Sequence, residues 1–476
     1  MKEERKGGFM KRKSGVLMHV SSLFGGYSVG SLGSAAEYFI DFLAESGFSV
    51  WQVLPLCIPD SEDSPYKSAA SFGFNPYFID LPTLYEEGLI DLDELSAARE
   101  VGPYLCEYGR LSRERLKLLF MAAMRVKDRS EAVNFIKARP EISAAAEFMA
   151  RKMPLGENES DRLFLWQFIS FEFIKQWGRV REYAKKRGVS IIGDIPFYVD
   201  LDSADVWANP KDFLLDGAGE PLAVAGVPPD CFSPDGQLWG NPLYDIERMR
   251  EDGFSLWRKR IRHSLSLFDG VRLDHFRAFE SYYAIERGAT DAREGKWMKG
   301  GGRELVKAIL DEAGDALMIA EDLGEITDGV RALLEYSGMP GMRVFQFGFD
   351  GDGDSPHLVH NWGKNTVGYT GTHDNNTLLG YVWELDGACR RRVFDYVGYS
   401  GEDFSEGVRR IVRSVMSSHA DTVIFPVQDI LGFGKDTRMN IPGAVGGNWR
   451  YRITREQLDT VNRERLRYFN SLYGRA

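Results

Sequence analysis

The chain has 476 residues, of which 43% are hydrophobic and 13% aromatic, so it can bury a large core. Its net charge of −11 argues against nucleic acid as a partner, because phosphate binding needs a basic surface. No apolar run reaches the ~18–20 residues of a membrane span, so no membrane partner is expected. The cysteines Cys57, Cys106, Cys231 and Cys389 have no paired spacing, which indicates neither a disulfide framework nor a zinc site and favours a cytoplasmic location.

Residues 1–13 are basic but lack the apolar stretch and cleavage site of a signal peptide, so we interpret them as a flexible tail. Short apolar runs bounded by turn residues then predict eight strands, at residues 15–20, 50–56, 190–197, 270–276, 317–320, 342–349, 367–370 and 422–427. Between them, amphipathic periodicity predicts helices at residues 34–46, 161–186, 254–267, 303–313, 326–336 and 407–418. Strands alternating with helices favour an α/β fold, a parallel (β/α)8 TIM barrel over residues 14–476.

Two connections are too long for simple crossovers between strands. Residues 82–160 are rich in Glu, Ala and Leu and predict a mostly helical inserted subdomain. Residues 200–253 are rich in Gly, Pro, Asp and Trp and predict a loop-rich one. We expect both insertions on the C-terminal face of the barrel.

The most informative segment is Val271-Arg272-Leu273-Asp274-His275-Phe276-Arg277, where charged residues interrupt an apolar strand. Such a cluster is costly unless chemistry requires it. Side chains alternate along a strand, so Arg272 and Asp274 are expected to share one face. The guanidinium favours the ionised carboxylate, which suits a nucleophile and not a proton donor. The alternative is an ion pair that only stabilises the fold.

Further polar residues follow the predicted strands, at the end where a barrel places its active site. They are His19, Asp194, Arg272, Asp274, His275, Glu321, Asp322, Gln346, His373, Asp374, Gln428 and Asp429. A single acid at a strand end is often a helix cap or a turn residue. Acids at the ends of several strands instead predict one shared site.

Several carboxylates with an arginine, histidines and aromatic residues, but no nucleophilic Ser or Cys motif, fit retaining glycosyl transfer. In that chemistry one carboxylate attacks the sugar and a second, ~5–5.5 Å away, donates and then takes back a proton. Aromatic residues in nearby loops suit the apolar faces of sugars; they are Tyr66, Tyr77, Tyr198, Trp207, Phe232 and Trp239. A metal-dependent hydrolase fits less well, since neither H-x-H nor H-E-x-x-H spacing occurs. No metal or cofactor is expected.

Ordered motif blocks over almost the whole chain resemble the amylomaltases, the 4-α-glucanotransferases of glycoside hydrolase family 77 in the α-amylase superfamily. Four of these blocks are Gly193-Asp194-Ile195-Pro196, Val271-Arg272-Leu273-Asp274-His275, Ala320-Glu321-Asp322-Leu323-Gly324 and Gly371-Thr372-His373-Asp374-Asn375. Two more favour the glucanotransferase branch: Asp63-Ser64-Pro65-Tyr66, and Gly226-Val227-Pro228-Pro229-Asp230 leading to Trp239-Gly240-Asn241-Pro242.

The resemblance implies transfer of α-1,4-glucan segments from a maltooligosaccharide or starch chain to the 4-OH of an acceptor, through a covalent glucosyl-enzyme. Cyclic glucans can be products of such an enzyme. Asp274 is implied as the nucleophile, Glu321 as the general acid/base with a raised pKa, and Asp374 as a transition-state stabiliser. The residues implied in substrate binding are Tyr66, Asp194, Asp230, Phe232, Trp239, Asn241, Arg272, His275, Gln346, His373 and Asn440. Without the family pattern, Glu321 and Asp322 fit the acid equally well.

The resemblance also implies a lid over the active site, carried by residues 200–253, in which Cys231 stands where Tyr is common. An α-1,4-glucan hydrolase of the amylase type is the alternative within carbohydrate chemistry. A non-catalytic glucan-binding protein would lack Asp274 or Glu321, and both are present. The glycine-rich stretch of residues 25–33 lacks the G-K-[ST] of a phosphate loop. It fits either a plain turn or a close approach of the backbone to a sugar.

Overall fold

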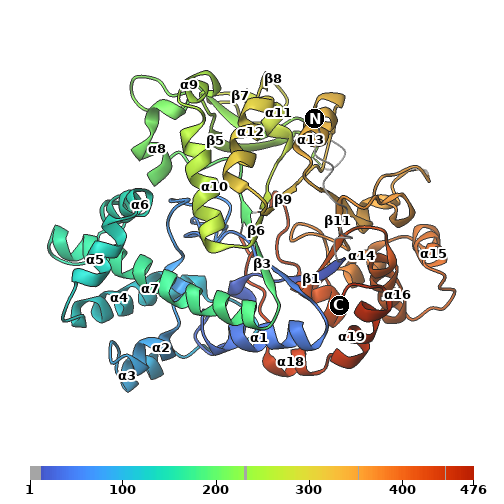
Figure 1. Cartoon of the computed structure of the whole chain (residues 1–476), viewed down its shortest axis with the longest axis horizontal. Helices are drawn as coiled ribbons and strands as arrows, with labels where there is room; N and C mark the ends of the chain where they lie inside the picture. The colour runs from blue at the N-terminus through green and yellow to red at the C-terminus, as the bar shows by residue number, and fades with distance from the viewer. Residues whose placement is uncertain (1–11, 230–232, 352, 445) are drawn as a thin grey trace, which may run out of the picture.

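The structure is a computed structural model, and it describes residues 12–229, 233–351, 353–444 and 446–476. Within these residues, eight parallel strands close into a barrel in the order β1-β12-β11-β10-β9-β6-β3-β2 (Figure 1). They are β1 (Lys13–Leu17), β2 (Val50–Gln52), β3 (Ser190–Ile195), β6 (Gly270–Leu273), β9 (Leu317–Ala320), β10 (Gly341–Val344), β11 (Thr366–Tyr369) and β12 (Thr422–Pro426). The predicted (β/α)8 TIM barrel is thus confirmed.

Helices surround the barrel strands (Figure 1). Those predicted from periodicity are α1 (Ser34–Glu45), α7 (Glu159–Lys186), α10 (Ser255–Leu267), α12 (Gly302–Ala313), α13 (Asp328–Ser337) and α16 (Phe404–Ser417). Every residue of β6, β11 and β12 is buried, because the strands face the barrel interior on one side and the helices on the other. Trp177 of α7 contacts both Trp51 of β2 and Phe268, so aromatic packing fixes this long helix to the barrel.

Several strands end earlier than the sequence predicts. β6 stops at Leu273 and β10 at Val344, where the chain continues as a turn or as a 3-10 helix. His275 has a φ of 51°, in the left-handed region that ends a strand. Asp274 therefore lies just beyond β6, but its N–H still donates to the Ile195 carbonyl of β3 over 3.0 Å, and its Oδ1 accepts a hydrogen bond from Arg272, two residues earlier in the chain.

Between β2 and α7 the chain is mainly helical, in α2 (Leu81–Glu86), α3 (Leu92–Ala97), α4 (Tyr108–Arg125), α5 (Ser130–Lys137) and α6 (Pro140–Lys152). Helices α4, α5 and α6 pack on α7 at one side of the molecule (Figure 1). Arg115 of α4 is buried and donates hydrogen bonds to the carbonyl oxygens of Tyr77 and Tyr27. These helices are thereby attached to the loops that follow β1 and β2.

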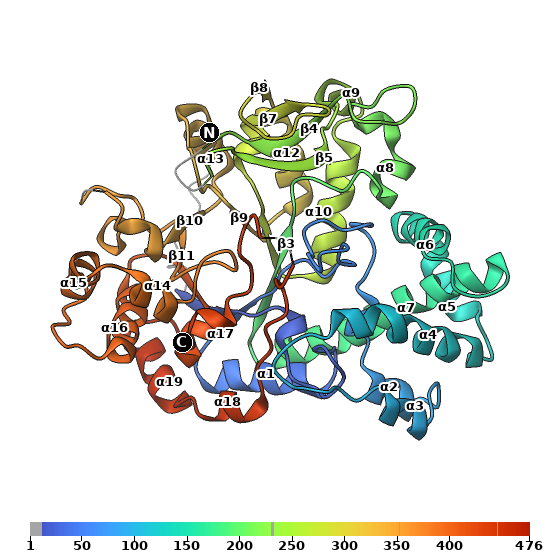
Figure 2. The ribbon, with the colours of Figure 1, turned by 180° about the vertical axis from the view of Figure 1, so that it is seen from behind.

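A second, antiparallel sheet of order β5-β4-β7-β8 lies beyond the barrel (Figure 2). Its strands are β4 (Ala223–Val227), β5 (Gln237–Pro242), β7 (Ser281–Glu286) and β8 (Gly295–Lys299). In the chain, α8 (Ala204–Ala208) precedes β4 and α9 (Ile246–Glu251) follows β5. The segment expected to be loop-rich thus contributes two paired strands. The short α11 (Arg277–Glu280) leads from the end of β6 into β7.

The C-terminal part contains α14 (Leu378–Glu384), α15 (Gly387–Tyr396), α17 (Val427–Leu431), α18 (Arg455–Asp459) and α19 (Arg463–Leu472). Asn470 of α19 is fully buried, where its amide accepts a hydrogen bond from Ser14 Oγ and donates one to the Ser46 carbonyl. The last helix is thereby attached to the outside of the barrel beside β1. No helix in the described ranges is long and apolar enough to cross a membrane.

Candidate active site

Arg272 of β6 lies between two carboxylates at the C-terminal end of the barrel. Its Nη1 donates to both oxygens of Asp194, the next-to-last residue of β3, over 2.8 and 2.7 Å, and its Nη2 donates to Asp274 Oδ1 over 2.8 Å. The Asp194 side chain is fully buried, whereas 27% of the Asp274 side chain is exposed. A buried guanidinium needs such partners, and here the two acids share it. Only Asp274 of the pair reaches the mouth.

Glu321 follows β9 directly, beside Asp274. Its Oε2 accepts a hydrogen bond from the backbone N–H of His275 over 2.7 Å, and its Oε1 accepts one from Leu323 over 3.1 Å. Burial, reinforced by the negative charge of Asp274 and opposed by Arg272, raises the pKa of Glu321 to about 8. The side chain therefore carries a proton at neutral pH, as the general acid of a glycosyl transfer requires. The raised pKa agrees with the expectation from the sequence.

Asp322 occupies the same strand end but makes different contacts. Its Oδ1 accepts a hydrogen bond from the backbone N–H of Met342 over 2.6 Å, and its Oδ2 pairs with Arg343 over 3.0 Å. Both partners lie on β10, and Asp322 is buried. The geometry therefore favours Glu321 over Asp322 as the proton donor, a choice that the residue types alone left open.

Asp374 lies on the loop after β11. Its Oδ2 is 3.2 Å from His373 Nε2, its Oδ1 accepts a hydrogen bond from Asn440 Nδ2 over 2.6 Å, and Arg438 binds its backbone oxygen. Burial acts to raise the pKa of Asp374, but His373 and Asn440 outweigh it and lower the pKa to about 2. Since 43% of this side chain is exposed, an ionised carboxylate faces the mouth.

Aromatic side chains form a wall beside these acids. The Tyr66 hydroxyl donates to Asp194 Oδ2 over 2.6 Å, and its ring stacks on His373 with centroids 4.9 Å apart. Trp449 lies 5.7 Å from both rings, and Trp239 contacts His275 edge-on at 5.0 Å. The sequence pattern pointed to Tyr66 and Trp239 but missed Trp449 and Arg438. The one local signal for Trp449 is the pair of glycines at residues 446–447.

The remaining predicted residues divide into two groups. The Gln346 amide donates to the Asn376 carbonyl, and the buried Asn241 amide donates to the Val199 carbonyl, each over 2.8 Å, so both groups hold loops around the mouth. Asp230 and Phe232, together with Cys231, lie outside the described residues. No cluster of His, Cys, Asp or Glu that could hold a metal ion occurs within the part of the chain that the structure describes.

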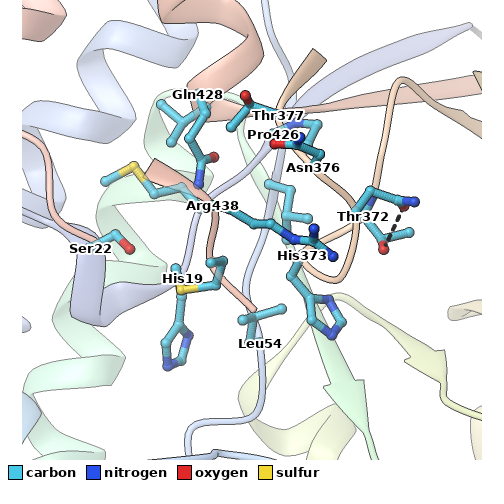
Figure 3. Close-up of a pocket in the computed structure, with 15 residues that line it drawn as sticks. His19, Ser22, Leu54, Thr372, His373, Asn376, Thr377, Pro426, Gln428 and Arg438 are labelled. Carbon is cyan, nitrogen blue, oxygen red and sulfur yellow. Dashed lines mark hydrogen bonds between the residues drawn. The ribbon is translucent and has the colours of Figure 1, made fainter. Parts of the chain in front are cut away.

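A small pocket adjoins these groups at the ends of β1, β11 and β12 (Figure 3). Its lining includes His19, His373, Gln428 and Arg438, and the rings of the two histidines point the same way, away from Gln428. Burial lowers the pKa of His19 to about 3, so its imidazole is neutral. The Gln428 amide donates to the Thr437 carbonyl over 3.0 Å, so it fixes the loop that carries Arg438 and Asn440. Both residues of this loop bind Asp374, Arg438 at its backbone oxygen and Asn440 at its Oδ1.

Comparisons with known proteins agree with this geometry. A family model described as 4-alpha-glucanotransferase matches residues 18–159 and 154–458. The 4-alpha-glucanotransferase of Streptococcus pneumoniae serotype 4 is 39% identical over 98% of this chain and 98% of its own. The chloroplastic/amyloplastic enzyme of the same name from Arabidopsis thaliana is 41% identical over 98% of this chain and 86% of its own.

Among solved structures, the amylomaltase from Streptococcus agalactiae in complex with acarbose superimposes with a TM-score of 0.92 and 35% identity, covering 98% of this chain and 100% of that one. The amylomaltase from Corynebacterium glutamicum, at 19% identity and a TM-score of 0.81, covers 97% of this chain and 74% of that one and supports the fold. The family model and the relatives that are 39% and 41% identical over 98% of this chain establish the family. The chain belongs to the 4-alpha-glucanotransferase family.

Proposed function

We propose that the protein performs its 4-α-glucanotransferase reaction as a retaining double displacement on α-1,4-glucans, with Asp274 as nucleophile and Glu321 as general acid/base. The observation that carries the assignment is that two neighbouring carboxyl groups have different surroundings. Asp274 is bound to Arg272, whereas beside it burial raises the pKa of Glu321 to about 8. Carboxyl groups in such different environments suit the two different roles.

In the first step, an Asp274 oxygen attacks the anomeric carbon of the donor and forms a glucosyl ester. The bond from that carbon to the glycosidic oxygen breaks, and Glu321 gives its proton to the departing oxygen. The two N–H groups of His275 and Leu323 hold the Glu321 carboxyl in one orientation throughout. The leaving glucan departs with a free 4-OH.

In the second step, the 4-OH of an acceptor glucose or glucan attacks the same carbon from the vacated side. Glu321, now ionised, takes the hydroxyl proton, and the ester bond to Asp274 breaks. Both displacements invert the anomeric carbon, so the product keeps the α configuration. Transfer requires that water reach the ester more slowly than sugar does, and each tenfold preference corresponds to about 1.4 kcal/mol of barrier difference.

The groups around the acids support a sugar at the point of attack. Asp374 presents an ionised carboxylate that can accept hydrogen bonds from hydroxyls, and Tyr66, Trp239 and Trp449 offer aromatic surface for the apolar faces of sugar rings. Arg272, which also pairs with the buried Asp194, binds Asp274 and holds it in place. A cytoplasmic location, suggested by the scattered cysteines, is part of the same proposal.

Incubation with maltotriose tests the function directly. A transferase converts it to glucose and a ladder of longer maltooligosaccharides with no net gain of reducing ends. A hydrolase increases the number of reducing ends, and a binding protein leaves maltotriose unchanged; either result would contradict the proposal. With long amylose as substrate, products without a reducing end would add cyclic glucans to the reaction.

A further inference from the structure

Strand β9, whose end carries Glu321, is joined unequally to its two neighbours. All of its residues pair with β6, from Leu317 with Gly270 to Ala320 with Leu273. Toward β10, which lies on its other side (Figure 2), the ladder is reduced to the single pair of Ala320 with Gly341. Backbone pairing with β10 is therefore confined to Ala320, the last residue of β9, whose N–H donates to the Pro340 carbonyl over 3.0 Å.

The Asp322 side chain adds a second connection to β10, two residues beyond Ala320. Its Oδ1 accepts the Met342 backbone N–H over 2.6 Å, and its Oδ2 binds Arg343 Nη1 over 3.0 Å. A carboxylate thus replaces a strand carbonyl as the acceptor for β10, and a charge-assisted bond of this kind is stronger than a neutral one. The backbone around Glu321 is then held on both flanks, since on the β6 side the Glu321 N–H donates to Leu273 over 3.0 Å.

The packing around Asp322 leaves this carboxylate little freedom. Gly341 lies against it, and a Cβ at that position would come within 2.6 Å of Asp322 Oδ2. Asp322 lines a surface cavity of about 550 Å³ together with Arg343 and His357. Its contacts are thus with β10 and this cavity, so any effect on the reaction passes through the backbone of the adjacent Glu321.

We propose that Asp322 is a positioning residue for the general acid/base: by binding the Met342 N–H and Arg343 on β10, it fixes the end of β9 and thereby the location of the Glu321 carboxyl. The proposal rests on the proposed function. A displacement of about 1 Å at a reacting group can cost roughly 100-fold in rate, so loss of this anchor should reduce turnover although Asp322 does not contact substrate.

The test compares Asp322→Ala and Asp322→Asn with Glu172→Ala. Glu172 is an equally buried carboxylate on α7, paired with Lys175 over 2.6 Å on the outside of the barrel. Each variant is assayed for kcat and KM on maltotriose, for the initial burst of fluoride release from α-glucosyl fluoride, and for thermal unfolding by circular dichroism. Fluoride leaves without a proton, so this burst reports formation of the glucosyl-enzyme without the acid step.

Asp322→Ala is expected to lower kcat on maltotriose by roughly 10- to 100-fold, to change KM little, and to retain a larger share of the fluoride burst. Asp322→Asn should recover part of kcat, because its amide oxygen can still accept the Met342 N–H. Glu172→Ala should unfold at a lower temperature but keep the wild-type kcat.

The proposal is overturned if Asp322→Ala keeps its kcat as Glu172→Ala does, or if it loses the fluoride burst and the maltotriose activity equally. If Asp322→Ala does not fold, Asp322→Asn is decisive. The proposal is overturned if this variant has the wild-type kcat on maltotriose and the wild-type ratio of activities on maltotriose and α-glucosyl fluoride. Failure of the proposed function would give different results: the wild-type protein would make no longer maltooligosaccharides from maltotriose, or the Glu321→Gln variant would be fully active.

Discussion

The backbone N–H of His275 donates a hydrogen bond to Glu321 Oε2 over 2.7 Å, which joins the residue after Asp274 to the opposing acid. His275 adopts a φ of 51°, a conformation that costs a non-glycine residue roughly 1–2 kcal/mol. This left-handed residue directly follows Asp274, whose own N–H donates to the Ile195 carbonyl of β3 over 3.0 Å. Strain at one residue thus accompanies the alignment of both carboxyl groups, as is common where a site must be preorganised.

Asp274→Asn should abolish turnover and leave the fold intact. The amide oxygen can still accept a hydrogen bond from Arg272 Nη2, so the buried guanidinium keeps a partner, but an amide does not form the glucosyl ester. We expect the rate on maltotriose to fall by roughly four orders of magnitude or more. Glucan affinity and the circular dichroism spectrum serve as controls. A variant that retains several per cent of the activity would refute the assignment of the nucleophile.

Glu321→Gln should be nearly inactive on maltotriose but still release a burst of fluoride from α-glucosyl fluoride. The pKa of about 8 adds a pH test: donor cleavage by the wild type needs the protonated acid, so kcat/KM on maltotriose should fall as the pH rises through about 8. The residual activity of Glu321→Gln should not show this fall as the pH rises. If the activity of the variant still falls as the pH rises through about 8, another group titrates in this range and Glu321 is not the acid.

The same raised pKa has a consequence for stability. The folded protein holds a proton on Glu321 up to about pH 8, whereas the unfolded chain releases it near the ordinary value of 4.5. Stability from this group is therefore fully present below about pH 4.5 and is lost as the pH rises toward 8. Glutamine stays neutral throughout. The melting temperature of Glu321→Gln relative to the wild type should thus increase from pH 5 to pH 8, and a constant difference would contradict the raised pKa.

Asn440→Ala should weaken the reaction through Asp374. The substitution removes the 2.6 Å hydrogen bond to Asp374 Oδ1, and a bond to a charged group contributes about 1.5–3 kcal/mol. A fall in kcat/KM of roughly 10- to 100-fold follows if the bond orients Asp374 in the transition state. Asn462→Ala, which removes the cap of α19, is the matched control and should retain full activity. Equal activities of the two variants would show that Asp374 needs no such support.

The barrel could be predicted from the sequence because its strands are buried on both faces and therefore appear as continuous apolar runs. The antiparallel sheet could not: most of β8 is exposed, and its Gly- and Lys-containing sequence forms a strand only through pairing with β7. The acids of the site were predictable because each lies at the end of a strand or shortly after it. The hydrogen bonds of the Asp322 side chain to β10 could not be predicted, because its partners Met342 and Arg343 lie 20 and 21 residues away in the chain.

Gly30→Ala distinguishes the two interpretations of the glycine-rich stretch after β1. A Cβ at residue 30 would lie 1.9 Å from the Val20 carbonyl oxygen, so the loop packs against its own beginning and needs glycine there. Overpacking of this kind costs about 1–3 kcal/mol, which should lower the melting temperature while KM for maltotriose stays unchanged. Gly102→Ala is the control, since nothing lies within 4 Å of its Cβ position. If Gly30→Ala keeps the wild-type melting temperature and instead raises KM, the stretch contacts the sugar and is not a simple packed turn.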